Sequence, residues 1–184
     1  YKRYQLLSLH GQTKDALHKN QLGAWEYDIV EPAYKCNMTD IMAGIGLAQI
    51  KRYPQLVERR HEIIKIYEDA LKGHQVKTLN HEDEKTNSKS SGHLFITRVE
   101  GIDEKTRNEI IIKMAERGIA TNVHYKPLPM LTAYKNLGFD IKNYPNAFDY
   151  YKSEITLPLY SLLTDEEAKY VITNFVYILK EYGK

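Results

Sequence analysis

The sequence predicts an α+β fold, and three stretches of the chain carry this prediction. From Leu56 to Leu71 apolar residues recur at steps of three and four, which is typical of an amphipathic helix. Residues 93–125 follow the pattern of a strand, a helix and a second strand. Residues 164–167 are Thr-Asp-Glu-Glu, a capping box that opens a last helix. Helices packed on a small sheet are the architecture that these elements favour.

The first elements are expected before residue 39. Residues 1–9 (YKRYQLLSL) resemble the end of a helix that is already under way, and the chain begins with Tyr1 rather than Met. We therefore expect the chain to be an internal piece of something longer. Trp25–Val30 combines Trp, Tyr and Ile, which favour extended backbone, so a strand is expected there and should end in a turn before Pro32.

An apolar helix is expected from Asp40 to Ile50. It is apolar on most sides and contains small residues that permit close backbone approach, which indicates a helix that is buried or lies at a subunit interface. Pro54 should kink or restart the helix, because an interior proline removes a hydrogen bond and clashes with the preceding turn. The amphipathic helix beyond it closes at Gly73.

The remaining elements are expected in the C-terminal part of the chain. Residues 80–92 carry no large apolar side chain and should form a solvated loop. A strand is expected over 93–99, followed by a helix between an N-cap at Asp103 and a stop at Gly118. Residues 119–125 alternate in polarity, which predicts a further strand. The last helix should present one apolar stripe made of Ala168, Val171, Ile172, Phe175 and Leu179.

Composition and charge exclude several classes of function. The 26 Lys and Arg residues nearly balance the 24 Asp and Glu residues, so the net charge of +2 gives no electrostatic footprint for nucleic acid or an anionic membrane. The apolar run Ile41–Ile50 is too short to cross a bilayer and no signal peptide is apparent, so a cytoplasmic protein is expected. Cys36 is the only cysteine, which excludes an intrachain disulfide and fits a reducing compartment.

Signature motifs of common enzymes and metal sites are absent from the sequence. The patterns G-x-S-x-G, H-E-x-x-H and G-x-G-x-x-G do not occur, nor does a phosphate-binding P-loop. The seven histidines are scattered without metal-ligand spacing, so no metal site is predicted. The functional prediction therefore depends on a different set of segments.

Five short segments in a fixed order resemble the C-terminal half of the nucleotide-sugar aminotransferases of the DegT/DnrJ/EryC1/StrS family. In that family a Leu-rich segment ends in His-Gly, and a turn then enters an Ala- and Gly-rich helix. A His-Leu-Phe strand, a His-Tyr-x-Pro strand end and a Leu-Pro-Leu segment follow. The matching segments here are His10-Gly11, residues 33–49, His93-Leu94-Phe95, residues 123–128 and Leu157-Pro158-Leu159. Each segment is a weak signal alone, but five in order cover nearly the whole chain.

The resemblance implies a pyridoxal 5'-phosphate enzyme of aminotransferase fold type I. Such enzymes move an amino group, usually from glutamate, onto a keto sugar attached to a nucleotide, and the complete enzyme is expected to be a homodimer. By this resemblance residues 1–38 are the tail of the large cofactor domain, residues 39–72 a long kinked connecting helix, and residues 73–184 the small C-terminal domain. Synthesis of a surface or spore polysaccharide would suit the family.

The catalytic lysine of the family is not expected in this chain. In the family that lysine forms a Schiff base with the cofactor and precedes the His-Gly motif, whereas this chain begins close to His10. The chain therefore resembles about half an enzyme, and no catalytic residue is assigned within it. Pyridoxal phosphate is expected in the complete enzyme and not in this piece by itself.

The resemblance makes Lys35 and Asn37 candidate cofactor-binding residues. Family members approach the cofactor phosphate of the neighbouring subunit with the turn that matches residues 34–37, and a lysine can contact phosphate as a point charge. The turn departs from the family pattern, since Ala33 replaces Gly and Cys36 replaces an aromatic residue. A plain turn-forming role for Lys35 and Asn37 is the equal alternative.

His124 and Tyr125 are the candidate substrate-binding residues. They match the strand end that faces the sugar nucleotide in the family. Alternation along the expected strand should place their side chains on opposite faces.

Two other functions stay open. One is a free-standing binding or regulatory module that kept the small domain and lost catalysis, and the near-neutral charge speaks against a DNA-binding version of it. The other is a fragment without a role of its own. A pyridoxal-lysine motif encoded directly before Tyr1 would favour the enzyme, whereas an independent start would favour the module.

Overall fold

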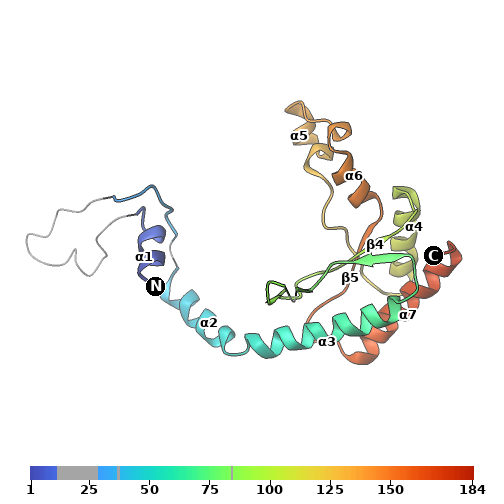
Figure 1. Cartoon of the computed structure of the whole chain (residues 1–184), viewed down its shortest axis with the longest axis horizontal. Coiled ribbons are helices and arrows are strands. Elements are labelled where there is room, and N and C mark those ends of the chain that lie inside the picture. Colours follow the sequence, from blue (N-terminus) through green and yellow to red (C-terminus); the bar gives the residue numbers. More distant parts are fainter. Residues whose placement is uncertain (12–28, 37, 84) are drawn as a thin grey trace, which may run out of the picture. The chain divides into compact units, whose positions relative to one another are not determined.

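The structure, a computed structural model, describes residues 1–11, 29–36, 38–83 and 85–184. The chain divides into two compact units, Tyr1–Arg52 and Tyr53–Lys184. Both units are drawn in Figure 1. Helices and sheet strands occur together, which confirms the α+β prediction. No helix among the described residues combines the length and the apolar character that crossing a bilayer requires.

The described residues of the first unit form two helices, α1 (Lys2–Ser8) and α2 (Asp40–Ile50). Between them the chain returns beside the end of α1 and pairs with it through backbone hydrogen bonds. The amides of His10 and Tyr34 donate to the carbonyl oxygens of Tyr34 and Leu7 at 2.8 and 3.0 Å. Leu9 and Lys35 face each other in an antiparallel bridge. The strand expected over 25–30 lies almost entirely outside the described residues.

The His10-Gly11 turn requires a glycine at its second position. Gly11 has φ +76° and is buried, and a Cβ added there would lie 2.0 Å from the carbonyl oxygen of Glu31. The carbonyl oxygen of Gly11 accepts a hydrogen bond from the amide of Val30 at 3.0 Å. The motif therefore has a local structural reason, because only glycine combines this backbone conformation with so close an approach.

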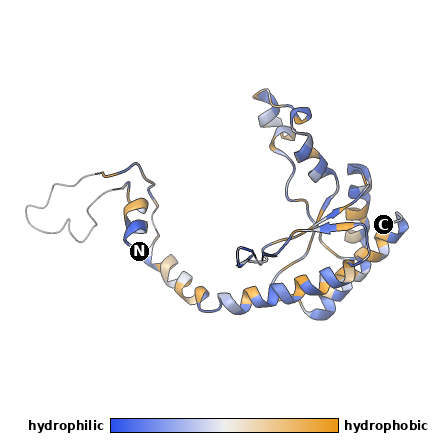
Figure 2. Cartoon of the chain, viewed as in Figure 1, coloured by the Kyte–Doolittle hydropathy of each residue, from blue (hydrophilic) through white to orange (hydrophobic). Residues whose placement is uncertain are grey.

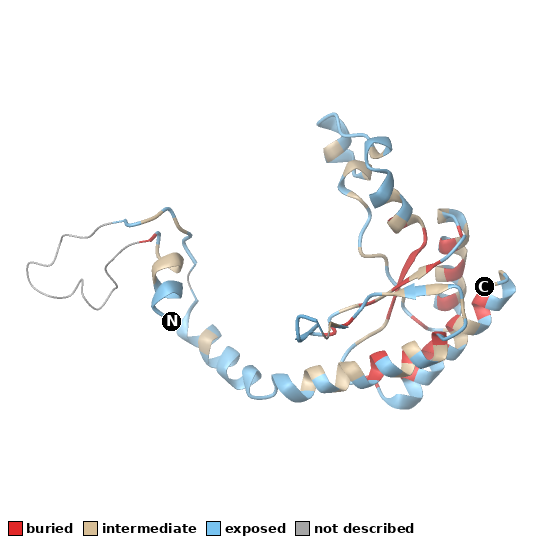
Figure 3. Ribbon diagram, viewed as in Figure 1, coloured by how far each residue is buried: buried red, intermediate tan, exposed pale blue. Residues whose placement is uncertain are grey.

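Helix α2 begins at a capped end and buries none of its residues. The Thr39 hydroxyl accepts a hydrogen bond from the Met42 amide at 3.3 Å. Figure 2 shows the apolar character of the helix, and Figure 3 shows that it is exposed along most of its length. Its exposed apolar side chains are Ile41, Met42, Ile45, Leu47 and Ile50. The sequence predicts a helix that is buried or lies at a subunit interface. The described part of the unit does not bury it, so the interface stays a prediction.

Pro54 restarts the helix, as expected. Helix α2 ends at Ile50, Lys51 and Arg52 form a turn, and α3 (Tyr53–Leu71) begins one residue before Pro54. A proline is tolerated in the first helical turn, because its missing N–H has no partner there in any case. The single kinked helix expected over 39–72 is therefore two helices.

The second unit is built around a three-stranded antiparallel sheet with the order β1-β4-β5. Val76 of β1 pairs with Val99 of β4, and Phe95 of β4 pairs with Leu157 of β5. After α3 its elements are β1 (Val76–Thr78), β2 (Glu82–Asp83), β3 (Ser88–Lys89), β4 (Phe95–Val99), α4 (Glu104–Glu116), η2 (Leu128–Met130), α5 (Thr132–Asn136), η3 (Ile141–Asn143), α6 (Pro145–Lys152), β5 (Glu154–Leu157) and α7 (Asp165–Glu181).

Two sequence-based expectations about strands are wrong. Residues 119–125 do not form a strand: they contribute a single bridge, in which Asn122 and Thr156 exchange two backbone hydrogen bonds of 2.8 and 3.1 Å. The place beside β4 is taken by β5, which pairs with it at four positions. The loop expected over 80–92 also contains the short hairpin of β2 and β3. Both errors concern pairing between segments, which alternation within one segment does not determine.

Helices α3, α4 and α7 cover the sheet and close one hydrophobic core. The five residues of the expected stripe on α7 are all buried, and the capping box at Thr164 is formed with Glu167. Figure 3 shows the buried positions gathered on these helices and on β4 and β5. The core consists of Ile63, Ile64, Tyr67, Leu71, Phe95, Val99, Ile102, Ile110, Met114, Ile119, Ile155, Leu157, Leu163, Ala168, Val171, Ile172, Phe175, Ile178 and Leu179.

Candidate functional site

The candidate site lies where the segment after Ile119 meets strand β5. All four residues of β5 are buried, so its polar side chains, those of Glu154 and Thr156, lie inside the protein. The bridge between Asn122 and Thr156 holds the segment next to the strand. His124 follows two residues later, so that its backbone amide reaches Glu154 and its ring reaches Thr156.

His124 is fixed to β5 through its backbone and its ring. Its amide donates to Oε2 of Glu154 at 2.8 Å, and its ring nitrogen Nδ1 lies 2.9 Å from Oγ1 of Thr156. The ring is half-buried and meets the ring of Tyr125 edge to face, with 4.6 Å between the centroids and 84° between the planes. The two side chains therefore do not point to opposite faces, because no strand forms there to impose the alternation.

Tyr125 presents a different kind of surface from His124. Its side chain is 73% exposed, so its ring and its hydroxyl are open to a ligand. Tyrosine combines an apolar face with a polar tip, which suits contact with a sugar or a base. The pair thus offers one hydrogen-bonding ring edge beside one exposed aromatic face.

Glu154 is a buried carboxylate that the sequence analysis missed. It has no exposed surface, and its two oxygens accept hydrogen bonds from the His124 amide and from the Thr156 hydroxyl. Burial raises the pKa of Glu154, while the Thr156 and His124 hydrogen bonds and the positive charges of His124 and Arg107 act in the opposite direction. A glutamate directly before the apolar run Ile-Thr-Leu-Pro-Leu was the signal that could have identified it, since buried carboxylates need partners.

Arg107 anchors the backbone that enters β5. It is 1% exposed, and its Nη1 donates to the carbonyl oxygens of Tyr151 and Glu154 at 3.1 and 3.4 Å. Its Nη2 lies 3.6 Å from Oε1 of Glu104, and its guanidinium stacks over the Tyr151 ring at 4.6 Å. Because these contacts are all internal, Arg107 stabilises the position of Glu154 and is not directed at a ligand.

The two candidate cofactor-binding residues belong to the other unit. Lys35 is exposed, and its backbone is held in the bridge with Leu9. The amides of Tyr34 and Cys36 donate to the carbonyl oxygens of Leu7 and Ser8 at 3.0 and 2.9 Å, so the backbone is held on both sides of Lys35. Asn37 lies outside the described residues.

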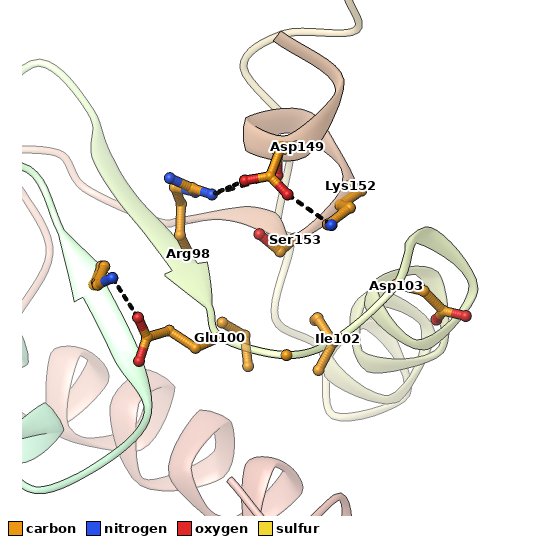
Figure 4. A pocket seen from close by; sticks show the side chains of 10 residues that line it. Arg98, Glu100, Ile102, Asp103, Asp149, Lys152 and Ser153 are labelled. Atoms are coloured by element: carbon orange, nitrogen blue, oxygen red, sulfur yellow. Dashed lines mark hydrogen bonds and ion pairs between the residues drawn. The ribbon is translucent and has the colours of Figure 1, made fainter. Parts of the chain in front are cut away.

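A separate hollow beside β4 is shown in Figure 4. Asp149 lies between Arg98 and Lys152, at 3.1 and 2.6 Å, and Glu100 pairs with Lys77. Apart from Asp103, which caps helix α4, the acidic and basic side chains that line it pair with one another, so they leave little net charge to attract an ion. Nor do three or more His, Cys, Asp or Glu side chains come together as metal ligands anywhere in the described part of the chain.

Comparison with known proteins adds a family and a set of relatives. The sequence model of the DegT/DnrJ/EryC1/StrS aminotransferase family matches residues 1–176. The spore coat polysaccharide biosynthesis protein SpsC of Bacillus subtilis is 35% identical over 177 residues, which are 92% of this chain and 44% of SpsC. The UDP-4-amino-4,6-dideoxy-N-acetyl-beta-L-altrosamine transaminase of Campylobacter jejuni is 30% identical over 183 residues, 99% of this chain and 46% of that enzyme.

Solved structures similar to this chain also match it over about half of their own length. Spr1654 from Streptococcus pneumoniae in its PMP form superposes with a TM-score of 0.80 and 57% identity, over 98% of this chain and 45% of that one. PseC of Helicobacter pylori superposes with a TM-score of 0.71 at 23% identity, which shows the shared fold alone. The chain thus spans about half the length of the relatives that it matches.

Proposed function

The chain belongs to the DegT/DnrJ/EryC1/StrS aminotransferase family, and from this premise we propose that it is the C-terminal portion of a nucleotide-sugar aminotransferase. The observation that carries the proposal is the family match over residues 1–176, joined to a structural likeness at 57% identity over nearly the whole chain. The complete enzyme moves an amino group from glutamate to a keto sugar nucleotide, and it works in the cytoplasm as a homodimer. Synthesis of a surface or spore polysaccharide is the process that its relatives favour.

The complete enzyme uses pyridoxal phosphate, which when bound stabilises negative charge at the carbon that loses or gains the amino group. One residue of this chain, Lys35, suits the phosphate group of that cofactor. Lys35 offers an exposed ammonium on a segment held by backbone hydrogen bonds, and a fixed cation suits a phosphate. Lys35, with Asn37 two residues on, binds the cofactor phosphate across the dimer. The lysine that forms the Schiff base lies outside these 184 residues.

His124 and Tyr125 bind the sugar nucleotide. The half-buried, hydrogen-bonded ring of His124 supports a polar contact with the sugar, and the exposed ring of Tyr125 supports stacking. In the complete enzyme residues 1–38 belong to the large domain, residues 39–72 connect the domains, and residues 73–184 form the small domain. The exposed apolar side chains of α2 support a surface that the rest of the dimer covers.

A non-catalytic module is the second candidate, and one observation favours it. The unit Tyr53–Lys184 closes a hydrophobic core from its own residues, as a domain with an independent role would. A module of this kind would keep the ligand-facing pair His124 and Tyr125 and would lack any amino-transfer activity.

The test is to produce the full-length protein and measure its two half-reactions separately. We expect Lys35→Ala and Asn37→Ala each to lower pyridoxal phosphate affinity about tenfold, since a charge-assisted or neutral hydrogen bond is worth roughly 1–3 kcal/mol. Lys105→Ala, which removes an exposed lysine of α4, is the matched control and should leave affinity unchanged.

His124→Ala separates the two half-reactions. We expect it to slow the sugar-nucleotide half-reaction and to spare the glutamate half-reaction, because only the former brings a sugar to this residue. Equal loss in both would remove His124 from the substrate site. A full-length protein without either half-reaction would favour the module.

A further inference from the structure

We propose that Glu154 and Thr156 are positioning residues that hold the His124 ring in the tautomer with its proton on Nδ1. Nε2 then faces outward as an acceptor for a hydroxyl group of the sugar. The identity of this ligand rests on the proposed function, whereas the tautomer is a property of this chain alone.

The tautomer follows from the donors and acceptors of the hydrogen bonds that join Glu154, Thr156 and His124. Both oxygens of ionised Glu154 can only accept, and one of them already accepts from the His124 amide at 2.8 Å. The other accepts from the Thr156 hydroxyl, which has a single proton to give. Oγ1 of Thr156 therefore meets Nδ1 of His124, 2.9 Å away, as an acceptor, and Nδ1 must carry the proton.

The other ring nitrogen is the one left for a ligand. Within the described residues Nε2 of His124 has no hydrogen-bond partner, and it is not one of the buried side-chain atoms that lack one: those are His81 Nε2, Arg98 Nε and Thr121 Oγ1. The lone pair of Nε2 thus reaches the surface beside Tyr125. A lone pair accepts from a hydroxyl or an amine and repels the oxygens of a pyrophosphate, so this edge favours a hydroxyl-bearing part of the substrate over its pyrophosphate.

The ionised state of Glu154 decides the direction of both hydrogen bonds, the one between Thr156 and Glu154 and the one between Thr156 and His124. Protonated Glu154 would donate to Thr156, which would then donate to Nδ1, and Nε2 would carry the proton instead. Burial is the largest influence and raises the pKa of Glu154, whereas the Thr156 and His124 hydrogen bonds and the charges of His124 and Arg107 favour its ionised form. The direction of the hydrogen bonds therefore follows from the two groups that donate to the carboxylate, the His124 amide and the Thr156 hydroxyl, and it applies at a pH where Glu154 is ionised. The acceptor character of Nε2 is therefore controlled by a carboxylate that itself touches no ligand.

The test is a nitrogen NMR measurement on the 184-residue chain with ¹⁵N-labelled histidine rings. The spectra are recorded at a pH well above the ordinary imidazole pKa of about 6.5, where the ring is neutral. The His124 signals are assigned by their loss in His124→Gln. We expect the protonated type of resonance for Nδ1 and the unprotonated type for Nε2. A His124 ring with its proton on Nε2 would overturn the proposal.

Glu154→Gln should reverse the tautomer. The side-chain carbonyl of the glutamine can still accept the hydrogen bond from the His124 amide, so the side-chain NH₂ group donates to Thr156. The Thr156 hydroxyl must then donate to Nδ1 of His124. The two resonances should exchange types. Glu104→Gln is the matched control, since it removes a nearby carboxylate that contacts Arg107 and Tyr151 and not His124. An unchanged tautomer in folded Glu154→Gln contradicts the proposal.

If Glu154→Gln does not fold, Thr156→Val tests whether β5 determines the tautomer of His124. Without the hydroxyl, Nδ1 loses its acceptor, and we expect a mixture of the two tautomers, whereas Thr156→Ser should restore the single form. If the His124 ring of Thr156→Val still carried its proton on Nδ1 alone, β5 would not determine the tautomer, and the proposal would be overturned.

The full-length protein separates this inference from the proposed function. Glu154→Gln should lower kcat/KM of the sugar half-reaction about tenfold, as expected for one lost hydrogen bond, and spare the glutamate half-reaction. A reversed tautomer with an unaffected sugar half-reaction would overturn the hydroxyl contact. A wild-type protein that lacks both half-reactions would sink the proposed function, while the NMR result would still decide the tautomer.

Discussion

The two units of the chain differ in what holds them together. The unit Tyr53–Lys184 closes a core of nineteen apolar residues between three helices and a sheet. Among the described residues of Tyr1–Arg52, by contrast, only Gly11 is buried. Its order there comes from a helix cap, the Arg3–Glu31 ion pair and a few backbone hydrogen bonds. Similar local elements therefore belong in one unit to a closed hydrophobic core and in the other to an exposed apolar surface.

The difference between the helices explains why. Helices α3 and α7 carry charged residues on one side and apolar residues on the other, so each buries one face and keeps the other in water. Helix α2 has no such division, because nearly every residue in it is apolar or small. A helix of that kind needs cover on several sides, and the described part of its unit provides none.

The largest expected effect is a contrast in the free energy of unfolding. Phe175→Ala in the core should cost about 3–5 kcal/mol, because a fully buried phenyl ring leaves a cavity. Leu47→Ala in α2, where the side chain is 65% exposed, should cost less than about 0.5 kcal/mol. Urea denaturation measures both, with Tyr177→Ala on the exposed face of α7 as the control. Comparable losses for Phe175 and Leu47 would break the comparison.

The next expected effect is on self-association. The exposed apolar side chains of α2 should drive the isolated chain to associate at high concentration. Ile45→Glu should weaken this association at least about tenfold, because it would bury an unpaired carboxylate. Ile112→Glu, which changes an equally exposed isoleucine of α4, should leave it unaltered. Analytical ultracentrifugation that finds a strict monomer, together with no binding of a hydrophobic dye, would contradict this expectation.

Local signals in the sequence predicted the self-sufficient unit well. Thr164 with Glu167 fixed the start of α7, and the apolar spacing after Leu56 placed α3 on the core. These features depend on residues within a few positions of one another. They could therefore be recognised without knowing the fold.

Pairing between distant segments could not be predicted in the same way. The strand expected over 119–125 is reduced to one bridge with β5, and Glu154 meets His124 across 30 positions in the sequence. His124 itself was identified from the family motif, whereas its buried partner was not. Neither residue type nor spacing reveals which carboxylate a histidine will meet once the sheet has formed.

The smallest expected effect is the pH dependence of the unit Tyr53–Lys184. Burial, and then the charge of His61, lower the pKa of His81, whose ring stacks on Phe95. Its other neighbours are Ser90, which bonds Nδ1 at 2.9 Å, and Glu68, Glu82 and Lys89 around the same hollow.

The unfolded chain therefore binds the His81 proton more tightly than the folded chain does. Stability should fall as the pH drops from about 6.5 toward the lowered pKa, by at most about 1.4 kcal/mol per pH unit. His81→Asn keeps an acceptor for Ser90 and should flatten this slope, whereas His93→Asn, on an exposed residue, should not. Parallel slopes in wild type and His81→Asn, measured by urea denaturation between pH of about 5 and about 7, would contradict the expectation.

The most direct test of the central claim is to trap the cofactor with borohydride. We propose that this chain is part of an aminotransferase whose Schiff-base lysine lies outside it. The 184-residue chain and the full-length protein are each mixed with pyridoxal phosphate, reduced, and mapped by peptide mass spectrometry. We predict a stoichiometric pyridoxyl adduct on one lysine of the full-length protein, outside the residues of this chain, and only scattered labelling of the isolated chain. A stoichiometric adduct on a single lysine between Lys2 and Lys184 would contradict the account.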